Sequence, residues 1–110
     1  MRSLSHDSLY QRIVDGAPDA ILFVDRDGVI HLWNAGAEAM FGHDEAQAVG
    51  QTLDLIIPER FRERHWEGFR AVMSSGVTKY AEGLLAVPAV TKDGGRISIE
   101  FTISLLKDIV

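Results

Sequence analysis

Residues 20–42 read AILFVDRDGVIHLWNAGAEAMFG, and this stretch decides the fold. Two apolar runs, residues 20–25 and 29–33, flank an Asp-Gly turn, which is a strong signal for a β-hairpin. Residues 35–41 follow as a short helix that stops at Gly42, because glycine is common just past a helix end. The stretch therefore predicts an antiparallel strand pair that leads directly into a helix.

Upstream of this stretch, residues 4–15 have the spacing of a short helix with one apolar face. A capping box at Ser8 suits its start, with an earlier start at Ser5 as the alternative, and Pro18 bars its continuation. Such a face must pack on the domain or on a second chain, so we expect it to form a homodimer contact. The residues of this face are Leu9, Tyr10, Ile13 and Val14.

Downstream, Pro58 is a favoured first residue for a long helix that continues to Ser75 and ends at Gly76. Residues 79–90 and 96–106 then predict two strands joined by an Asp-Gly-Gly turn. The second of these alternates apolar and polar residues, which is typical of a sheet with one face on a core. The order of elements predicts an α+β domain, with an antiparallel sheet and helices on one face.

The composition is that of a single globular domain of 110 residues, with 46% hydrophobic and 25% charged residues. The absence of cysteine excludes disulfides, thiolate metal sites and photochemistry through a cysteinyl adduct. A net charge of −5 argues against direct binding to nucleic acid. No apolar run approaches the roughly 20 residues that span a bilayer, and no secretory signal is evident. We therefore expect no membrane contact and a cytoplasmic location.

Seven short motifs occur in one order between about residues 9 and 106. They are Pro18-Asp19-Ala20-Ile21, Asp25-Arg26-Asp27-Gly28, Trp33-Asn34-Ala35, Ala37-Glu38-Ala39-Met40-Phe41-Gly42, Val49-Gly50-Gln51, Ile57-Pro58-Glu59-Arg60-Phe61-Arg62 and Lys92-Asp93-Gly94. In this order and spacing they resemble a PAS domain of the bacterial sensory-box type, as found in histidine kinases and diguanylate cyclases. The resemblance extends in part to the haem-PAS oxygen sensors.

The resemblance implies a PAS fold, in which five antiparallel strands form the sheet and the last strand lies beside the first hairpin. The sequence stops where that last strand should begin, so we expect it to be missing here. The expected organisation is an N-terminal amphipathic helix over residues 1–16 and a PAS domain over residues 17–110, truncated before its last strand.

His65 is the sharpest candidate for a binding residue. It lies four residues from Phe61 and from Phe69 on the long helix, which puts an imidazole on an apolar stripe. Haem-PAS oxygen sensors place their proximal histidine on this helix, so the resemblance implies that His65 is the metal ligand if haem is bound. The opposite strand carries leucines where those sensors have arginine or methionine. The residues expected around the ligand are His65, Phe61, Phe69, Val72, Leu84, Leu85, Ile99 and Phe101.

Three alternatives to haem stay open at this point. Flavin could use Trp33 and Asn34, although that pair also occurs where it only closes the second strand of the family. A small ligand could occupy an aliphatic pocket between sheet and helices. A filled core, with no ligand at all, is the ordinary fate of such apolar residues.

The sequence offers no nucleophile elbow and no phosphate-binding loop, so we expect a protein without enzymatic activity. The resemblance implies a sensory or regulatory module of a bacterial signal-transduction protein that controls an output domain. Its rivals are a haem-based gas or redox sensor, and an interaction module with a filled core.

Overall fold

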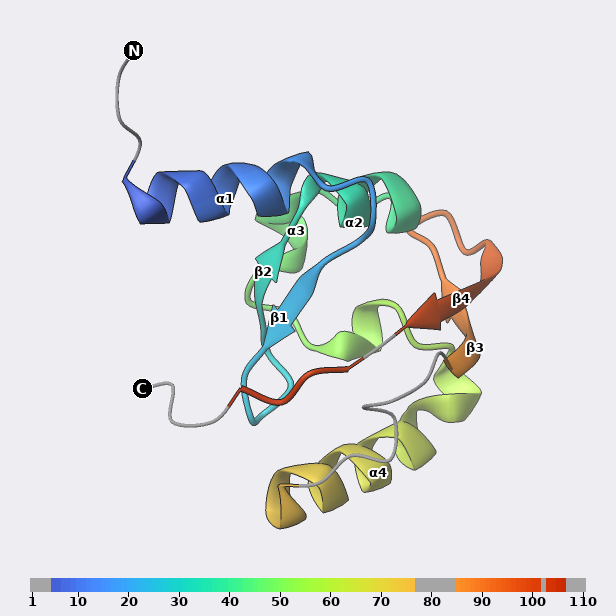
Figure 1. Cartoon of the computed structure of the whole chain (residues 1–110). Helices are drawn as coiled ribbons and strands as arrows, with labels where there is room; N and C mark the ends of the chain where they lie inside the picture. Colours follow the sequence, from blue (N-terminus) through green and yellow to red (C-terminus); the bar gives the residue numbers. More distant parts are fainter. Residues whose placement is uncertain (1–4, 77–84, 102, 107–110) are drawn as a thin grey trace.

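The computed structural model describes residues 5–76, 85–101 and 103–106. Figure 1 shows α1 and α4 at opposite ends of the molecule, with the two strand pairs between them. The elements of the described residues are α1 (His6–Gly16), β1 (Leu22–Val24), β2 (Ile30–Trp33), α2 (Ala35–Phe41), α3 (Glu45–Ala48), the 3₁₀ turns η1 (Leu53–Leu55) and η2 (Glu59–Phe61), α4 (Arg62–Ser75), β3 (Leu85–Val90) and β4 (Arg96–Phe101).

The first predicted hairpin is confirmed, with strands shorter than the apolar runs that predicted them. β1 and β2 pair antiparallel. The Asp25 carboxylate closes the turn, because its Oδ1 accepts hydrogen bonds from the backbone N–H of Asp27 (2.9 Å) and of Val29 (3.1 Å). Gly28 has a φ of 81°, a left-handed conformation that glycine adopts at little cost.

Asn34 joins the start of the domain to the helix that follows the hairpin. Its side-chain oxygen accepts from the N–H of Ile21 (2.8 Å) and of Ala37 (2.9 Å), which makes it the N-cap of α2. Its amide nitrogen donates to the carbonyls of Val14 (2.8 Å) and Asp19 (2.9 Å). With 1% of its surface exposed, Asn34 therefore links α1, the loop that leads to β1, and α2 through one buried side chain.

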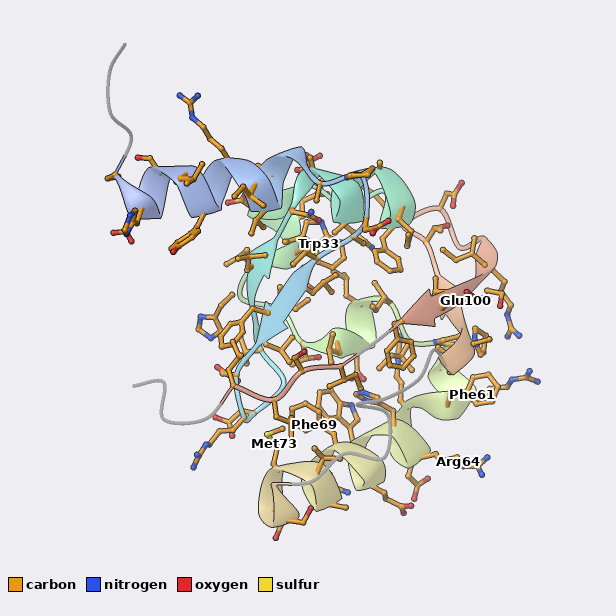
Figure 2. The ribbon with its side chains drawn as sticks, in the orientation of Figure 1. Trp33, Phe61, Arg64, Phe69, Met73 and Glu100 are labelled. Atoms are coloured by element: carbon orange, nitrogen blue, oxygen red, sulfur yellow. The ribbon has the colours of Figure 1, made fainter. Side chains whose placement is uncertain are left out.

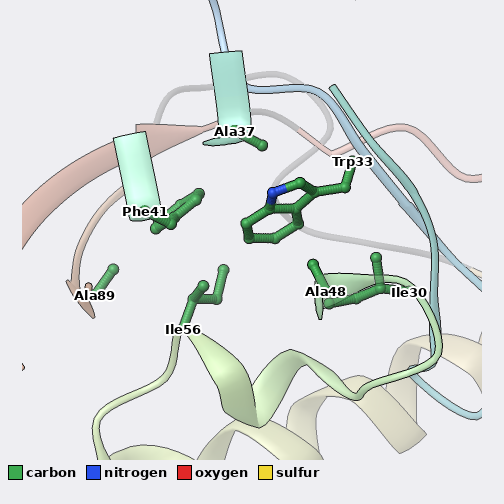
Figure 3. Packing of buried hydrophobic residues seen from close by; sticks show 7 residues of the cluster. All are labelled: Ile30, Trp33, Ala37, Phe41, Ala48, Ile56 and Ala89. Carbon is green, nitrogen blue, oxygen red and sulfur yellow. The ribbon is translucent and has the colours of Figure 1, made fainter. Parts of the chain in front are cut away.

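The core lies between the first hairpin, the short helices and β3, as Figure 3 shows. Trp33 and Phe41 form its centre, with ring centroids 5.4 Å apart. The indole N–H of Trp33 donates to the carbonyl of His43 (2.9 Å), so its polar atom is satisfied inside the core. The buried apolar residues are Ile30, Trp33, Ala37, Phe41, Ala48, Ile56 and Ala89.

Two helix starts differ from the first expectation. Ser5, not Ser8, caps α1, because its hydroxyl accepts from the N–H of Ser8 (3.1 Å). The long helix was predicted to begin at Pro58, which instead precedes the tight turn η2. There Phe61 N–H bonds the Pro58 carbonyl (2.9 Å), a spacing of three residues, and α4 begins only at Arg62.

The second predicted hairpin is also confirmed. β3 and β4 pair antiparallel, with Leu85 opposite Phe101, and the predicted alternation appears as alternating exposed and partly buried residues along β4. Of the predicted strand over residues 96–106, residues 96–101 form β4, and residues 103–106 lie in no strand. Within the described residues the hairpins form two separate two-stranded sheets. Residues 79–84 of the predicted strand lie outside the described residues.

Candidate functional site

Trp66 docks α4 on the first hairpin. Its indole N–H donates to Oδ1 of Asp54 in η1, at 2.7 Å. The six-membered ring of Trp66 lies against Gly28, and a β-carbon at that position would overlap the ring. Gly28 is thus required both by its backbone conformation and by the close approach of Trp66.

Arg62 supports the same contact one helical turn earlier. Its guanidinium donates to the carbonyl of Ile57 (Nε, 3.1 Å) and to the carbonyl of Asp54 (Nη2, 3.2 Å). Its distance from the Asp54 carboxylate is longer, 3.9 Å between two partly exposed side chains, so that ion pair contributes little. Arg62 and Trp66 are four residues apart and therefore share one face of α4.

His65 lies beside this docking contact and is half-buried. Its ring centroid is 4.7 Å from that of Trp66, edge to face, and 6.0 Å from that of Phe69. Burial lowers the pKa of His65 below the ordinary value of 6.5, and the negative charge of Asp54 opposes this shift only in part. The imidazole is therefore mostly neutral at pH 7, the form that can bind a metal.

The Nδ1 atom of His65 is buried without a hydrogen-bond partner in the described part of the chain. Buried polar atoms are nearly always paired, and leaving one unpaired costs about 1–3 kcal/mol. A ligand that offered this nitrogen a partner would recover that free energy. This atom is the strongest sign of a binding site among the described residues.

Two of the predicted neighbours share the face of α4 that carries His65. Phe69 and Val72 are both partly buried. Figure 2 shows Phe69 directed from α4 toward the rest of the domain, whereas Arg64 points away from it. Phe69 also packs edge to face on Trp66, with centroids 5.2 Å apart. His65, Phe69 and Val72 thus form the described wall of the candidate site.

Phe61 does not belong to this wall in the way the sequence predicted. It lies in η2, before α4 begins, so the four-residue spacing to His65 is not a full α-helical turn. Its ring is instead covered by the guanidinium of Arg60, 4.6 Å from the ring centroid.

The predicted residues on the second hairpin are only partly described. Ile99 and Phe101 are partly buried, and Ile99 packs against the core cluster. Leu84 lies outside the described residues. For Leu85 the structure describes the backbone, which pairs with Phe101.

Trp66 and Asp54 were not predicted as site residues. Trp66 lies within the long predicted helix, and a tryptophan that packs on a neighbouring element needs an acceptor for its N–H. The sequence feature that could have pointed to this acceptor is Asp54, because it is the one acidic residue in the apolar segment 52–57. Only the tertiary structure pairs the two.

The possible flavin contacts have other roles. Trp33 is buried in the core, and Asn34 uses its amide oxygen and nitrogen in four hydrogen bonds. An open hollow of about 510 Å³ lies elsewhere and contains none of the predicted site residues. It is lined by Ala39, Met40, Phe41, Gly42, Thr91, Lys92 and Asp93. No cluster of three potential metal ligands from His, Asp and Glu occurs among the described residues.

Comparison with known proteins identifies the fold. A family model described as the PAS fold matches residues 8–109. The chain belongs to the PAS family. The PAS domain of a Colwellia psychrerythraea protein superimposes with a TM-score of 0.72 at 23% identity, covering 87% of this chain and 78% of that one.

Other PAS relatives are sensors by name. The sensor protein FixL of Bradyrhizobium diazoefficiens is 40% identical over 53 residues, 48% of this chain and 10% of FixL. The oxygen sensor protein DosP of Escherichia coli is 27% identical over 85 residues, 77% of this chain and 10% of DosP. The PAS domain of the Cronobacter turicensis quorum-sensing receptor RpfR, in complex with C12:0, has a TM-score of 0.65 at 20% identity, covering 84% of this chain and 86% of that one.

This PAS chain matches a small part of its relatives. It spans 10% of the length of FixL and 10% of the length of DosP. In the part of the chain that the structure describes, no helix is long and apolar enough to cross a membrane.

α1 of this PAS domain presents the apolar face that the sequence predicted. None of its residues is buried, and Leu9, Tyr10 and Ile13 are 40%, 59% and 59% exposed. Val14 is partly buried, and its carbonyl accepts the bond from Asn34. α1 is therefore tied to the core at its C-terminal end, while its apolar face meets solvent.

Proposed function

We infer that this PAS domain is a non-catalytic sensory module that binds a small ligand on the face of α4 carrying His65. The Nδ1 of His65, buried and without a partner among the described residues, carries this inference. A ligand there would also cover the partly buried rings of Trp66 and Phe69. Two sequence relatives named as sensors, and an RpfR PAS domain in complex with C12:0, support ligand binding by such a domain.

Haem is the ligand that His65 fits best. The side chain of His65 is mostly neutral at pH 7 and half-buried, and it borders the aromatic ring of Phe69. These features suit an imidazole that binds haem iron as an axial ligand. When bound, haem would supply an iron centre for a diatomic gas or for a one-electron change. His65 would hold the iron, while Phe69 and Val72 would shield the ring from water.

A colourless ligand is the alternative, and one experiment separates it from a filled core. The chain is purified from haem-supplemented cells, its absorption spectrum is recorded, and C12:0 is added while thermal unfolding is followed. A Soret band supports haem. A raised Tm with C12:0, and a smaller rise in Phe69→Ala, supports an apolar ligand on the same face. The absence of both the Soret band and the rise in Tm would contradict the inference and favour an interaction module.

The output of this module is proposed to pass through a homodimer of α1. Three exposed apolar side chains on a helix with no buried residue support this pairing. Ile13→Glu is expected to yield a monomer that keeps its fold, while Gln11→Glu adds the same charge on another part of α1 and leaves the dimer intact. Light scattering and circular dichroism measure both. A dimer unchanged by Ile13→Glu would refute the pairing. In this proposal the output domain that the dimer controls belongs to a longer protein.

A further inference from the structure

The docking of α4 is concentrated in its first two turns. Trp66 bonds Asp54 and lies against Gly28, and Arg62 bonds the carbonyls of Asp54 and Ile57. Farther along, Val72 is only partly buried and Met73 is exposed. α4 therefore has a docked end, defined by Arg62 and Trp66, and a loosely packed end.

The docked end fixes how α4 is rotated about its axis. Successive residues of an α-helix are about 100° apart, so His65 and Trp66 project in different but rigidly related directions. With Trp66 bound to Asp54, the ring of His65 faces the same side as Phe69. Losing the Trp66 contact would free α4 to turn and let the unpaired Nδ1 of His65 reach water.

We propose that Asp54 is a positioning residue that holds His65 in the ligand site by accepting the hydrogen bond of Trp66. The Asp54 carboxylate does not touch the ligand in this account. Its role is to keep the half-buried imidazole, whose Nδ1 has no partner among the described residues, pointing inward before any ligand arrives. This proposal rests on the proposed function for its biological meaning, but its structural content is testable without a ligand.

The geometry separates the hydrogen bond from the charge of Asp54. In Asp54→Asn the side-chain oxygen still accepts from the indole N–H, although the negative charge is gone. In Asp54→Ala the acceptor is lost. In Trp66→Phe the donor is lost, and the shorter side chain also gives up the contact of the outer indole ring with Gly28. Arg62 depends on this site mainly through main-chain carbonyls, which all three variants retain.

The test is carbethoxylation of the ligand-free chain by diethyl pyrocarbonate, measured histidine by histidine with peptide mass spectrometry. The exposed His6 and His31 serve as internal references. We expect His65 to react slowly in the natural chain and in Asp54→Asn. Its rate should rise several-fold in Asp54→Ala and Trp66→Phe, because without this hydrogen bond α4 can turn and expose the half-buried ring more fully.

A control distinguishes positioning from general loss of stability. Phe41→Leu weakens the core at α2, away from α4, and should leave His65 protected. Equal rates in Asp54→Ala and the natural chain would overturn the proposal, as would a rate in Asp54→Asn as high as in Asp54→Ala. If Asp54→Ala fails to fold, the contrast between Asp54→Asn, which keeps the acceptor, and Trp66→Phe, which removes the donor, decides the matter.

The same samples keep the two inferences apart. If haem added to the natural chain gives no Soret band, the haem function fails, while the reactivity pattern still supports Asp54 as the residue that orients His65. If haem binds but the pattern is absent, the positioning role fails and the haem site stands.

Discussion

Asn34→Ala is expected to be among the most damaging single substitutions in this PAS domain. The change removes four hydrogen bonds from a side chain that is 1% exposed. The N–H groups of Ile21 and Ala37 lose their acceptor, at about 1–2 kcal/mol each when little water can replace it. The carbonyls of Val14 and Asp19 lie nearer the surface and can turn to water. The expected loss is therefore about 2–4 kcal/mol, against about 5–15 kcal/mol for a whole domain.

The assay is urea unfolding followed by circular dichroism, with an unchanged slope and a midpoint lowered by about 1–2 M. Ser5→Ala is the comparison, because Ser5 is an exposed cap with one bond to a backbone N–H and should cost at most about 1 kcal/mol. Hydrogen exchange of the α1 amides should also accelerate in Asn34→Ala, since the bond to Val14 is lost. A loss no greater than that of Ser5→Ala would refute the role given to Asn34.

Two further predictions concern the site. Gly28→Ala should destabilise the chain more than Gly94→Ala, measured by urea unfolding. Both glycines have a positive φ (81° and 85°), for which alanine costs about 1–2 kcal/mol, but only Gly28 is covered by Trp66. Equal losses would contradict that contact. Burial lowers the pKa of His65 in the folded state, so the unfolded chain binds the proton first and stability falls as pH drops below about 6.5. His65→Gln should flatten this fall between pH 7.5 and 5.5, and an unchanged slope would contradict the burial.

The sequence predicted most accurately where the signal was local. The bounds of α2 match the prediction, because Asn34 before the helix and Gly42 after it determine where it begins and ends. Both hairpins follow from Asp-Gly turns within a few residues of the strands that they join. Such features depend on backbone preferences that each residue carries with it.

The prediction failed where distant segments decide the outcome. α4 begins only after the tight turn at Phe61, where Arg62 bonds the carbonyls of Asp54 and Ile57. The bonds of Asn34 reach residues 13–20 positions away along the chain. Likewise Trp66 and Asp54, 12 residues apart, gain their role only when α4 packs on the first hairpin.

The most direct test of the account is a titration of the purified chain with haem, followed by absorption in the Soret region, in the natural sequence and in His65→Ala. His6→Ala, on the exposed part of α1, is the matched control. We expect a saturable band at one haem per chain that persists in His6→Ala and is lost in His65→Ala. An identical band in His65→Ala, or no saturable band in the natural chain, would contradict the assignment of haem to His65.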